Sequence, residues 1–204
     1  RMTVHSLTLK CFRGIRDGMR RDILELDFER LAPDAALVAI AGANGRGKTT
    51  VMDNLHPYLL MPSRASTGTP GGFSYYEHVV LPESEKSLVW EMDGRRYRSQ
   101  LVIRSGGRRR TEAYLFAWDG GAWQPAVIAD GTMSDGRCDS YSRCVESICG
   151  SAETFFTSVF AAQGRRHLSQ YRNAEIKGLL ADLLGLDEIG QLGSRAQEVV
   201  RGFK

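Results

Sequence analysis

Apolar and polar positions alternate in two segments near the start of the chain, residues 3–12 and 22–28. A period of two is the pattern of a strand with one buried and one solvated face. Residues 37–41 are instead continuously apolar, as in a strand that is covered on both faces. The pattern therefore predicts two half-buried strands, followed by a strand inside a layered α/β core.

Residues 87–127 carry the clearest β pattern of the chain. The alternating runs are separated by three short turns, Asp93-Gly94, Gly106-Gly107 and Asp119-Gly120-Gly121. Such glycine-containing pairs favour tight hairpin turns, so the region predicts a four-stranded antiparallel meander. Residues 62–85 precede it with three prolines, three glycines and no sustained period, and predict a long loop.

Helical spacing of apolar residues predicts helices over 48–60, 138–149, 152–160 and 174–184. Further on, apolar residues recur at intervals of three and four, at Ile189, Leu192, Ala196, Val199 and Phe203. This heptad seam is unfinished at Lys204, so residues 187–204 predict the start of a truncated coiled coil. Leu183–Glu188 is similar to an acidic Walker B strand, but the helical period favours a helix, with Asp187 as the N-cap of the last helix.

Composition narrows the class of protein only modestly. The chain has 204 residues, of which 42% are hydrophobic and 25% charged, which excludes a disordered tail, a collagen-like chain and a disulfide miniprotein. No apolar run approaches the roughly 18 residues of a membrane span, and a net charge of +3 does not by itself predict a nucleic-acid partner. The four cysteines form no C-x-x-C pair, which favours reduced thiols in a cytoplasmic protein.

The strongest chemical signal is the segment Gly42–Thr49, which fits G-x-x-x-x-G-K-[ST] between a predicted strand and a predicted helix. Glycines allow backbone N–H groups to surround phosphate oxygens, and the start of the helix adds partial positive charge. In this motif Lys48 reaches the β- and γ-phosphates, and Thr49 supplies a hydroxyl to Mg²⁺. The sequence therefore predicts a site for ATP and Mg²⁺.

Three segments, in order along the chain, carry a family pattern: Leu-Lys-Cys-Phe-Arg-Gly-Ile at 9–15, the glycine-rich loop at 40–50, and Phe-Phe-Thr-Ser-Val-Phe-Ala-Ala-Gln-Gly at 155–164. Together they resemble the opening strand, Walker A motif and Q-loop of the SMC-type, SbcC-like DNA-repair ATPases. The resemblance implies an α/β fold, the N-terminal lobe of a P-loop ABC-type ATPase head over residues 1–186, with an antiparallel β subdomain at about 87–127.

The resemblance also assigns roles to residues of the site. It implies that Lys48 and Gln163 act in catalysis, that Thr49 and Gln163 bind Mg²⁺, and that Arg13 lies near the nucleotide phosphates. The complete set expected to bind the nucleotide is Arg13, Asn44, Gly45, Arg46, Gly47, Lys48, Thr49 and Thr50.

The signature motif and Walker B of this family lie in a second half of the head, beyond a coiled coil. We therefore expect an ATPase completed by the C-terminal half of the same head, with this chain alone binding ATP without efficient turnover. The implied partners are that half, a second head in a homodimer, DNA and a nuclease subunit, in the cytoplasm and associated with the nucleoid, without a membrane. A chromosome-maintenance or defence-system protein belongs to the same class.

Two alternatives are a free-standing P-loop phosphotransferase of nucleotide-kinase type and the nucleotide-binding subunit of an ABC transporter. A carboxylate near the γ-phosphate within this chain would favour the phosphotransferase. The start of a coiled coil after Leu186 argues against the transporter.

Four arginines gather at one predicted hairpin turn, namely Arg104, Arg108, Arg109 and Arg110. Arginines in such a cluster bind DNA phosphates without reading base sequence, so these four are candidates for DNA contact. The alternative interpretation is a solvated turn at the edge of the sheet.

Overall fold

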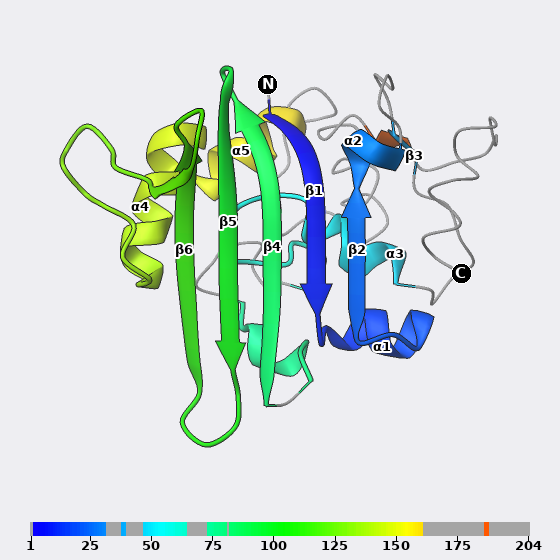
Figure 1. The fold of residues 1–204 in the computed structure, drawn as a ribbon. Coiled ribbons are helices and arrows are strands. Elements are labelled where there is room, and N and C mark those ends of the chain that lie inside the picture. The colour runs from blue at the N-terminus through cyan, green and yellow to red at the C-terminus, as the bar shows by residue number, and fades with distance from the viewer. Residues whose placement is uncertain are drawn as a thin grey trace.

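The computed structural model describes residues 2–31, 38–39, 47–64, 73–80, 82–160 and 186–187. These residues form an α/β fold built on a six-stranded antiparallel sheet of order β2-β1-β4-β5-β6-β7, with α5 and the segment after α3 behind it in Figure 1. The strands of this sheet are β1 (Met2–Lys10), β2 (Ile23–Asp27), β4 (Glu83–Met92), β5 (Arg95–Arg104), β6 (Arg110–Trp118) and β7 (Trp123–Pro125). The helices are α1 (Arg13–Met19), α2 (Phe28–Leu31), α3 (Lys48–Met52), α4 (Cys138–Cys149) and α5 (Ala152–Phe160), with one 3₁₀ turn at Tyr75–Glu77.

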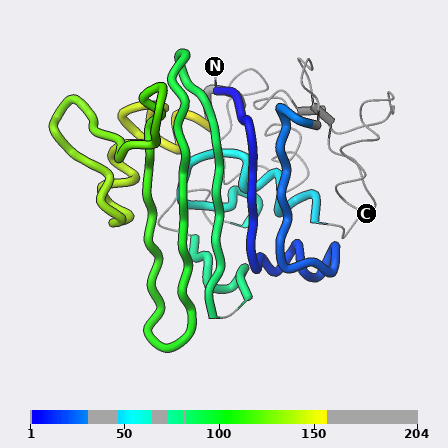
Figure 2. The backbone as a smooth tube through the Cα atoms, in the orientation of Figure 1, coloured from blue at the N-terminus to red at the C-terminus, as the bar shows by residue number. Residues whose placement is uncertain are grey.

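The predicted meander is confirmed as β4 to β7, and its path can be followed in Figure 2. Asp93 and Gly94 both take positive φ, of 51° and 75°, as the tight turn between β4 and β5 requires. The two N-terminal strands are also confirmed. They extend the sheet to six strands, because β1 pairs antiparallel with both β2 and β4. Strand β4 begins at Glu83, so the end of the predicted loop 62–85 is already part of the sheet.

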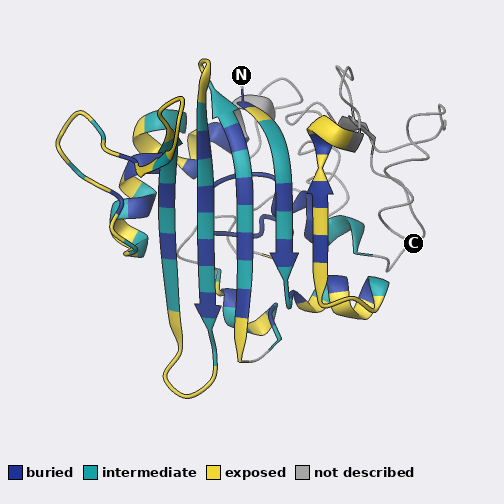
Figure 3. Ribbon diagram, viewed as in Figure 1, coloured by how far each residue is buried: buried dark blue, intermediate teal, exposed yellow. Residues whose placement is uncertain are grey.

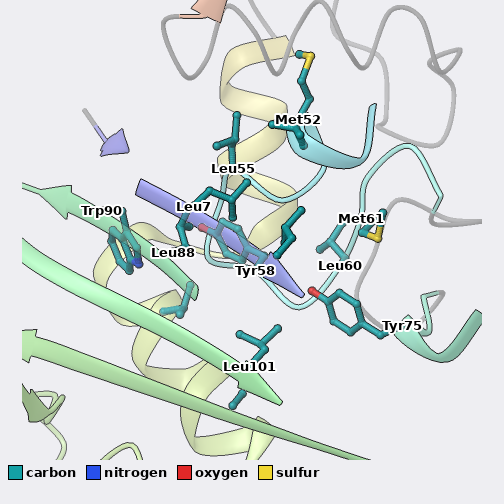
Figure 4. Packing of buried hydrophobic residues seen from close by; sticks show 14 of the residues in the cluster. Leu7, Met52, Leu55, Tyr58, Leu60, Met61, Tyr75, Leu88, Trp90 and Leu101 are labelled. Atoms are coloured by element: carbon teal, nitrogen blue, oxygen red, sulfur yellow. The ribbon is translucent and has the colours of Figure 1, made fainter. Parts of the chain in front are cut away.

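One face of the sheet is buried, as the alternating colours along the strands in Figure 3 show. The side chains of Leu7, Leu88 and Leu101 point from three strands into a single core with no more than 1% of their surface exposed. Figure 4 shows this layer beside Leu55 and Tyr58 of the segment that follows α3. Because α3 has only five residues, too few to be stable alone, its helical form depends on this packing.

The prediction of a helix over 48–60 is wrong after Met52, where α3 ends. Two residues explain the early end. The side-chain amide of Asn54 donates to the backbone oxygen of Thr50 at 2.7 Å, which is the local bond by which asparagine competes with helix. Pro57 disfavours helical geometry at His56. Residues 53–63 instead form an irregular segment that is almost wholly buried under the sheet.

The predicted helices over 138–149 and 152–160 are confirmed as α4 and α5. All four cysteines are free, and Cys138, Cys144 and Cys149 lie on α4. The helix predicted over 174–184 and the heptad residues from Ile189 onward lie outside the described residues.

A second, two-stranded sheet overturns one interpretation made from the sequence. Strand β3 (Val38–Ala39), which confirms part of the strand predicted over 37–41, pairs in parallel with β8 (Leu186–Asp187). Leu186 and Asp187 therefore lie on a strand, and the preference for a helix over a strand was wrong at these two residues. The helical period upstream of them concealed the strand, because two residues are too few to carry a period of their own. The prediction that Asp187 caps a following helix concerns residues outside those that the structure describes.

Candidate nucleotide-binding site

Gly47 brings the chain into α3 with a left-handed backbone, at φ 87° and ψ 2°. Its surroundings also favour glycine, because a β-carbon there would lie 3.2–3.3 Å from atoms of Met19, Gly14 and Ile15. Lys48 follows directly as the first residue of α3. The described end of the phosphate-loop motif thus has the turn into a helix that the sequence predicts.

The other residues expected to bind the nucleotide fall on both sides of this point. Thr49 and Thr50 lie in α3, and Thr50 is buried. Asn44, Gly45 and Arg46 lie outside the described residues, as does Gln163.

Helix α1 packs against α3 and joins the opening motif to the phosphate loop. A β-carbon on Gly14 would lie only 1.9 Å from the hydroxyl oxygen of Thr50, so the Thr50 side chain occupies the space that the absence of a side chain at Gly14 leaves open. The sequence predicts a strand over 3–12 here, and the structure ends that strand at Lys10 and begins α1 at Arg13. Two of the three segments that carry the family resemblance are therefore in contact.

The side chain of Arg13 lies against the segment that follows the 3₁₀ turn. Its Nε donates to the backbone oxygen of Glu77 at 3.2 Å, and its Nη2 donates to that of Val79 at 3.4 Å. The backbone N–H of Arg13 also donates to the oxygen of His78 at 2.9 Å. In this structure the guanidinium therefore anchors residues 77–79 to the start of α1.

The third segment of the resemblance begins on α5, and α5 packs against the chain that leaves α3. The ring of Phe156 meets the ring of His56 edge-on at 5.1 Å between centroids, and Phe155 lies 5.0 Å from Tyr58. Segments from three distant parts of the sequence thus meet at α3 and the residues that follow it.

A buried polar cluster lies just beyond α3, and the sequence analysis missed it. Asp53, at the C-terminal end of α3, accepts hydrogen bonds from the backbone N–H of Ser63 at 2.9 Å and from the Ser63 hydroxyl. Lys86 of β4 donates from Nζ to the backbone oxygen of His56 at 2.8 Å. The position of Lys86 could have been predicted from the alternation along β4. Lys86, Leu88 and Trp90 are two residues apart, so their side chains lie on the same, inner face of the sheet.

The parallel pair of β3 and β8 brings a carboxylate-bearing residue beside the strand that leads into the phosphate loop. In its register, Val38 pairs with Leu186 and Ala39 with Asp187. The chain therefore places the backbone of Asp187 on the strand next to the one that precedes Gly42.

The arginine hairpin between β5 and β6 is partly neutralised. Arg104 forms ion pairs with Glu83 at 3.2 Å and Glu112 at 2.9 Å, and Arg110 forms one with Glu112 at 2.6 Å. The guanidinium of Arg109 lies 5.3 Å from the centre of the Tyr76 ring. Arg108 is exposed and forms no ion pair with any residue that the structure describes.

Comparison with protein-family models gave no match, and no curated protein has significant similarity to this chain. Within the described residues, no group of three or more histidine, cysteine, aspartate or glutamate side chains is arranged to hold a metal ion. None of the described helices is long and apolar enough to cross a membrane.

Proposed function

We propose that this chain is the ATP-binding half of an SMC-type, SbcC-like ATPase head. The observation that carries the proposal is the left-handed Gly47 followed directly by Lys48 at the start of α3, with α1 packed closely against it. The fold fits the N-terminal lobe of an ABC-type head, since an antiparallel sheet accompanies a parallel β3–β8 pair next to the phosphate loop.

In this proposal the glycine-rich backbone and Lys48 bind the phosphates of ATP, and Thr49 supplies a hydroxyl to Mg²⁺. Gln163 completes the Mg²⁺ shell and responds to the γ-phosphate. The carboxylate that positions the attacking water comes from the other half of the head. The chain alone therefore binds ATP but turns it over poorly.

The test is binding of Mg²⁺ with a non-hydrolysable ATP analogue, measured by calorimetry on the wild type and Lys48→Ala. Loss of the Lys48 ammonium should weaken binding at least tenfold, about 1.4 kcal/mol, because a charge-assisted contact to phosphate is lost. Lys10→Ala is the matched control, since Lys10 lies in a half-exposed ion pair with Glu85 on the far face of the sheet. Equal binding by all three proteins would exclude the phosphate-loop assignment.

The wider proposal is that two such heads dimerise around ATP, act on DNA in end processing, repair or chromosome maintenance, and work with a nuclease subunit. It draws on the resemblance of the three motif segments. Reconstitution with the C-terminal half of the head should give an ATP-dependent dimer, which light scattering would detect. Absence of a dimer in the reconstituted head would contradict it.

A free-standing phosphotransferase is the second candidate, and the position of Asp187 on β8 favours it. An acidic residue on the strand next to the phosphate-loop strand can hold Mg²⁺ and its water in P-loop enzymes. The two candidates differ in turnover by the chain alone. A rate of order 1 s⁻¹ that is lost in Asp187→Asn would favour the phosphotransferase, and its absence would favour the half-head.

A further inference from the structure

Lys86 occupies an unusual place for a lysine. It lies in the middle of β4 on the inner face of the sheet, and none of its surface is exposed. Lysine is almost never fully buried without a partner, because removing an ammonium from water is costly. The sheet therefore directs a charge-bearing side chain into a largely apolar core that also holds Asp53 and His56.

The partner of Lys86 is the chain that leaves α3. Its Nζ donates to the backbone oxygen of His56 at 2.8 Å. Some carbonyl groups of this buried segment accept from its own backbone, as that of Tyr58 does from the N–H of Leu60 at 2.9 Å. The carbonyl of His56 instead accepts from a side chain of another element, because a buried carbonyl needs a donor. Tyr141 of α4 serves the next carbonyl, that of Pro57, in the same way. Lys86 thus joins the sheet to this segment by a hydrogen bond from an ammonium group. Hydrogen bonds from charged donors are about twice as strong as those from neutral donors.

The same segment is tied to the nucleotide site through Asp53. The backbone N–H of Asp53 donates to the oxygen of Thr49 at 2.8 Å, so Asp53 caps the C-terminal end of α3. Its carboxylate is held by Ser63 and attracts the Lys86 ammonium. Helix α3 therefore has two contacts that hold it in place. Thr50 packs on Gly14 of α1, and Asp53, which attracts Lys86, caps the C-terminal end of the helix.

We propose that Lys86 is a positioning residue for the nucleotide site. From the inner face of β4 it holds residues 53–56 in place, and thereby fixes the orientation of α3, which presents Lys48 and Thr49 to the phosphates. This inference rests on the proposed function. It adds a role for the antiparallel sheet, which becomes the support on which the phosphate-binding helix is set.

The charge of Lys86 changes near neutral pH. Burial lowers the pKa of Lys86 to about 7, partly offset by the carboxylate of Asp53. Burial and, to a smaller extent, the charge of Lys86 hold the pKa of His56 well below 6.5, so His56 is neutral near neutral pH. The hydroxyls nearby belong to Tyr58, Tyr75 and Tyr141, whose pKa values burial raises above 10, so they also stay neutral.

The experiment compares the affinity of the wild type and Lys86→Met for Mg²⁺ with a non-hydrolysable ATP analogue. Methionine keeps the length of the side chain and removes its charge, so we expect Kd to rise about tenfold at pH 6.5. Leu115→Ala is the control: Leu115 is fully buried on the inner face of β6, two strands away from β4, and its truncation should lower stability without changing Kd.

A pH series separates positioning from general stability. The ratio of the two Kd values should be largest at pH 6, where Lys86 is charged, and should fall toward pH 8.5, where the neutral amine still donates to the His56 carbonyl but no longer as a charged group. The ratio cancels the titration of the nucleotide itself. A ratio that does not change with pH would overturn the role of the ammonium.

If folded Lys86→Met binds as tightly as the wild type, the positioning role is wrong while the nucleotide site stands. If the wild type does not bind, the proposed function and this inference fail together. If Lys86→Met does not fold, Ser63→Ala replaces it, because it removes the hydroxyl bond that holds the carboxylate of Asp53. That variant should raise Kd about threefold, and an unchanged Kd would overturn the proposal.

Discussion

The meander of β4 to β6 and the buried segment 53–63 pack against each other, yet they are stabilised in different ways. In the meander, backbone groups pair with one another in a continuous register, from Glu83 with Arg104 to Met92 with Arg95. In the segment, the backbone pairs only in short local turns, and two of its carbonyl groups, those of His56 and Pro57, accept from Lys86 and Tyr141 of other elements. Because the backbone of the meander is already paired, substitutions there should affect stability mainly through apolar packing. The stability of segment 53–63 should depend more on single polar contacts.

The largest effect should come from the core under the meander. Trp90 is fully buried, stacks on Tyr97 at 4.7 Å and donates from Nε1 to the Ser99 hydroxyl. Trp90→Ala should lower the free energy of unfolding by about 3–5 kcal/mol, since it removes a large side chain and leaves a cavity. Urea unfolding followed by circular dichroism measures this. A loss below about 1 kcal/mol would mean that the sheet does not depend on its inner face.

The buried segment should give the protein a pH dependence that the meander does not. Lys86 has a pKa of about 7 in the folded protein, against 10.5 for an ordinary lysine, so between these values the unfolded chain binds more protons. Stability should therefore rise with pH, by up to about 1.4 kcal/mol per pH unit. The useful window is pH 7 to 9, because burial also raises the pKa of Cys149 to about 12, which opposes the rise at higher pH.

Lys86→Met provides the comparison for this pH dependence. The difference in unfolding free energy between wild type and variant should change in the wild type's favour from pH 7 to pH 9, while contributions from cysteine and tyrosine cancel. Two parallel curves would show that Lys86 does not titrate in this range.

The meander could be predicted from the sequence better than segment 53–63, because its contacts are local and those of the segment are long-range. Period-two alternation and Asp93-Gly94 were enough to predict the meander, because local pattern and tertiary environment agree there. The helix predicted over 48–60 ignored Pro57, which was a readable signal of its end. The pairing of Lys86 with His56 could not be read, since it joins residues 30 positions apart through a backbone carbonyl.

The candidate site follows the same division. The motif was enough to predict the turn at Gly47 and the helix at Lys48, both of which are local. The close contact of Gly14 with Thr50 and the strand at Asp187 depend on long-range packing, which a single sequence does not reveal. The bonds of Arg13 to the carbonyls of Glu77 and Val79 were equally invisible.

A single hydroxyl should matter in the buried segment. The Tyr141 hydroxyl donates to the Pro57 carbonyl and lies 2.8 Å from the Ser99 hydroxyl. Tyr141→Phe keeps the ring and leaves that carbonyl buried without its donor, which should cost about 1–3 kcal/mol. Tyr97→Phe on the sheet is a suitable comparison, since the same atom is removed from a tyrosine that stacks on Trp90. An equal loss of unfolding free energy in both variants would show that segment 53–63 depends no more on single polar contacts than the sheet does.

A smaller effect is expected at the first turn of the meander. Gly94 has φ 75° with open space around its α-carbon, so Gly94→Ala meets no steric clash and suffers only from the left-handed backbone. The expected loss is about 1–2 kcal/mol. Thermal unfolding would detect it, and an unchanged melting temperature would mean that the turn rearranges without cost.

The smallest effect on stability should come from the arginine hairpin, where the same residues also test DNA binding. Arg110 pairs with Glu112 but is largely exposed, and such surface pairs contribute about 0–1 kcal/mol, so Arg110→Ala should scarcely change unfolding. Its DNA contribution should also be small, because Glu112 already neutralises it. Arg108→Ala removes a charge without such a pair, and in a reconstituted head it should lower the salt slope of DNA binding by about one unit. Equal slopes for the wild type and both variants would leave the hairpin as a solvated turn.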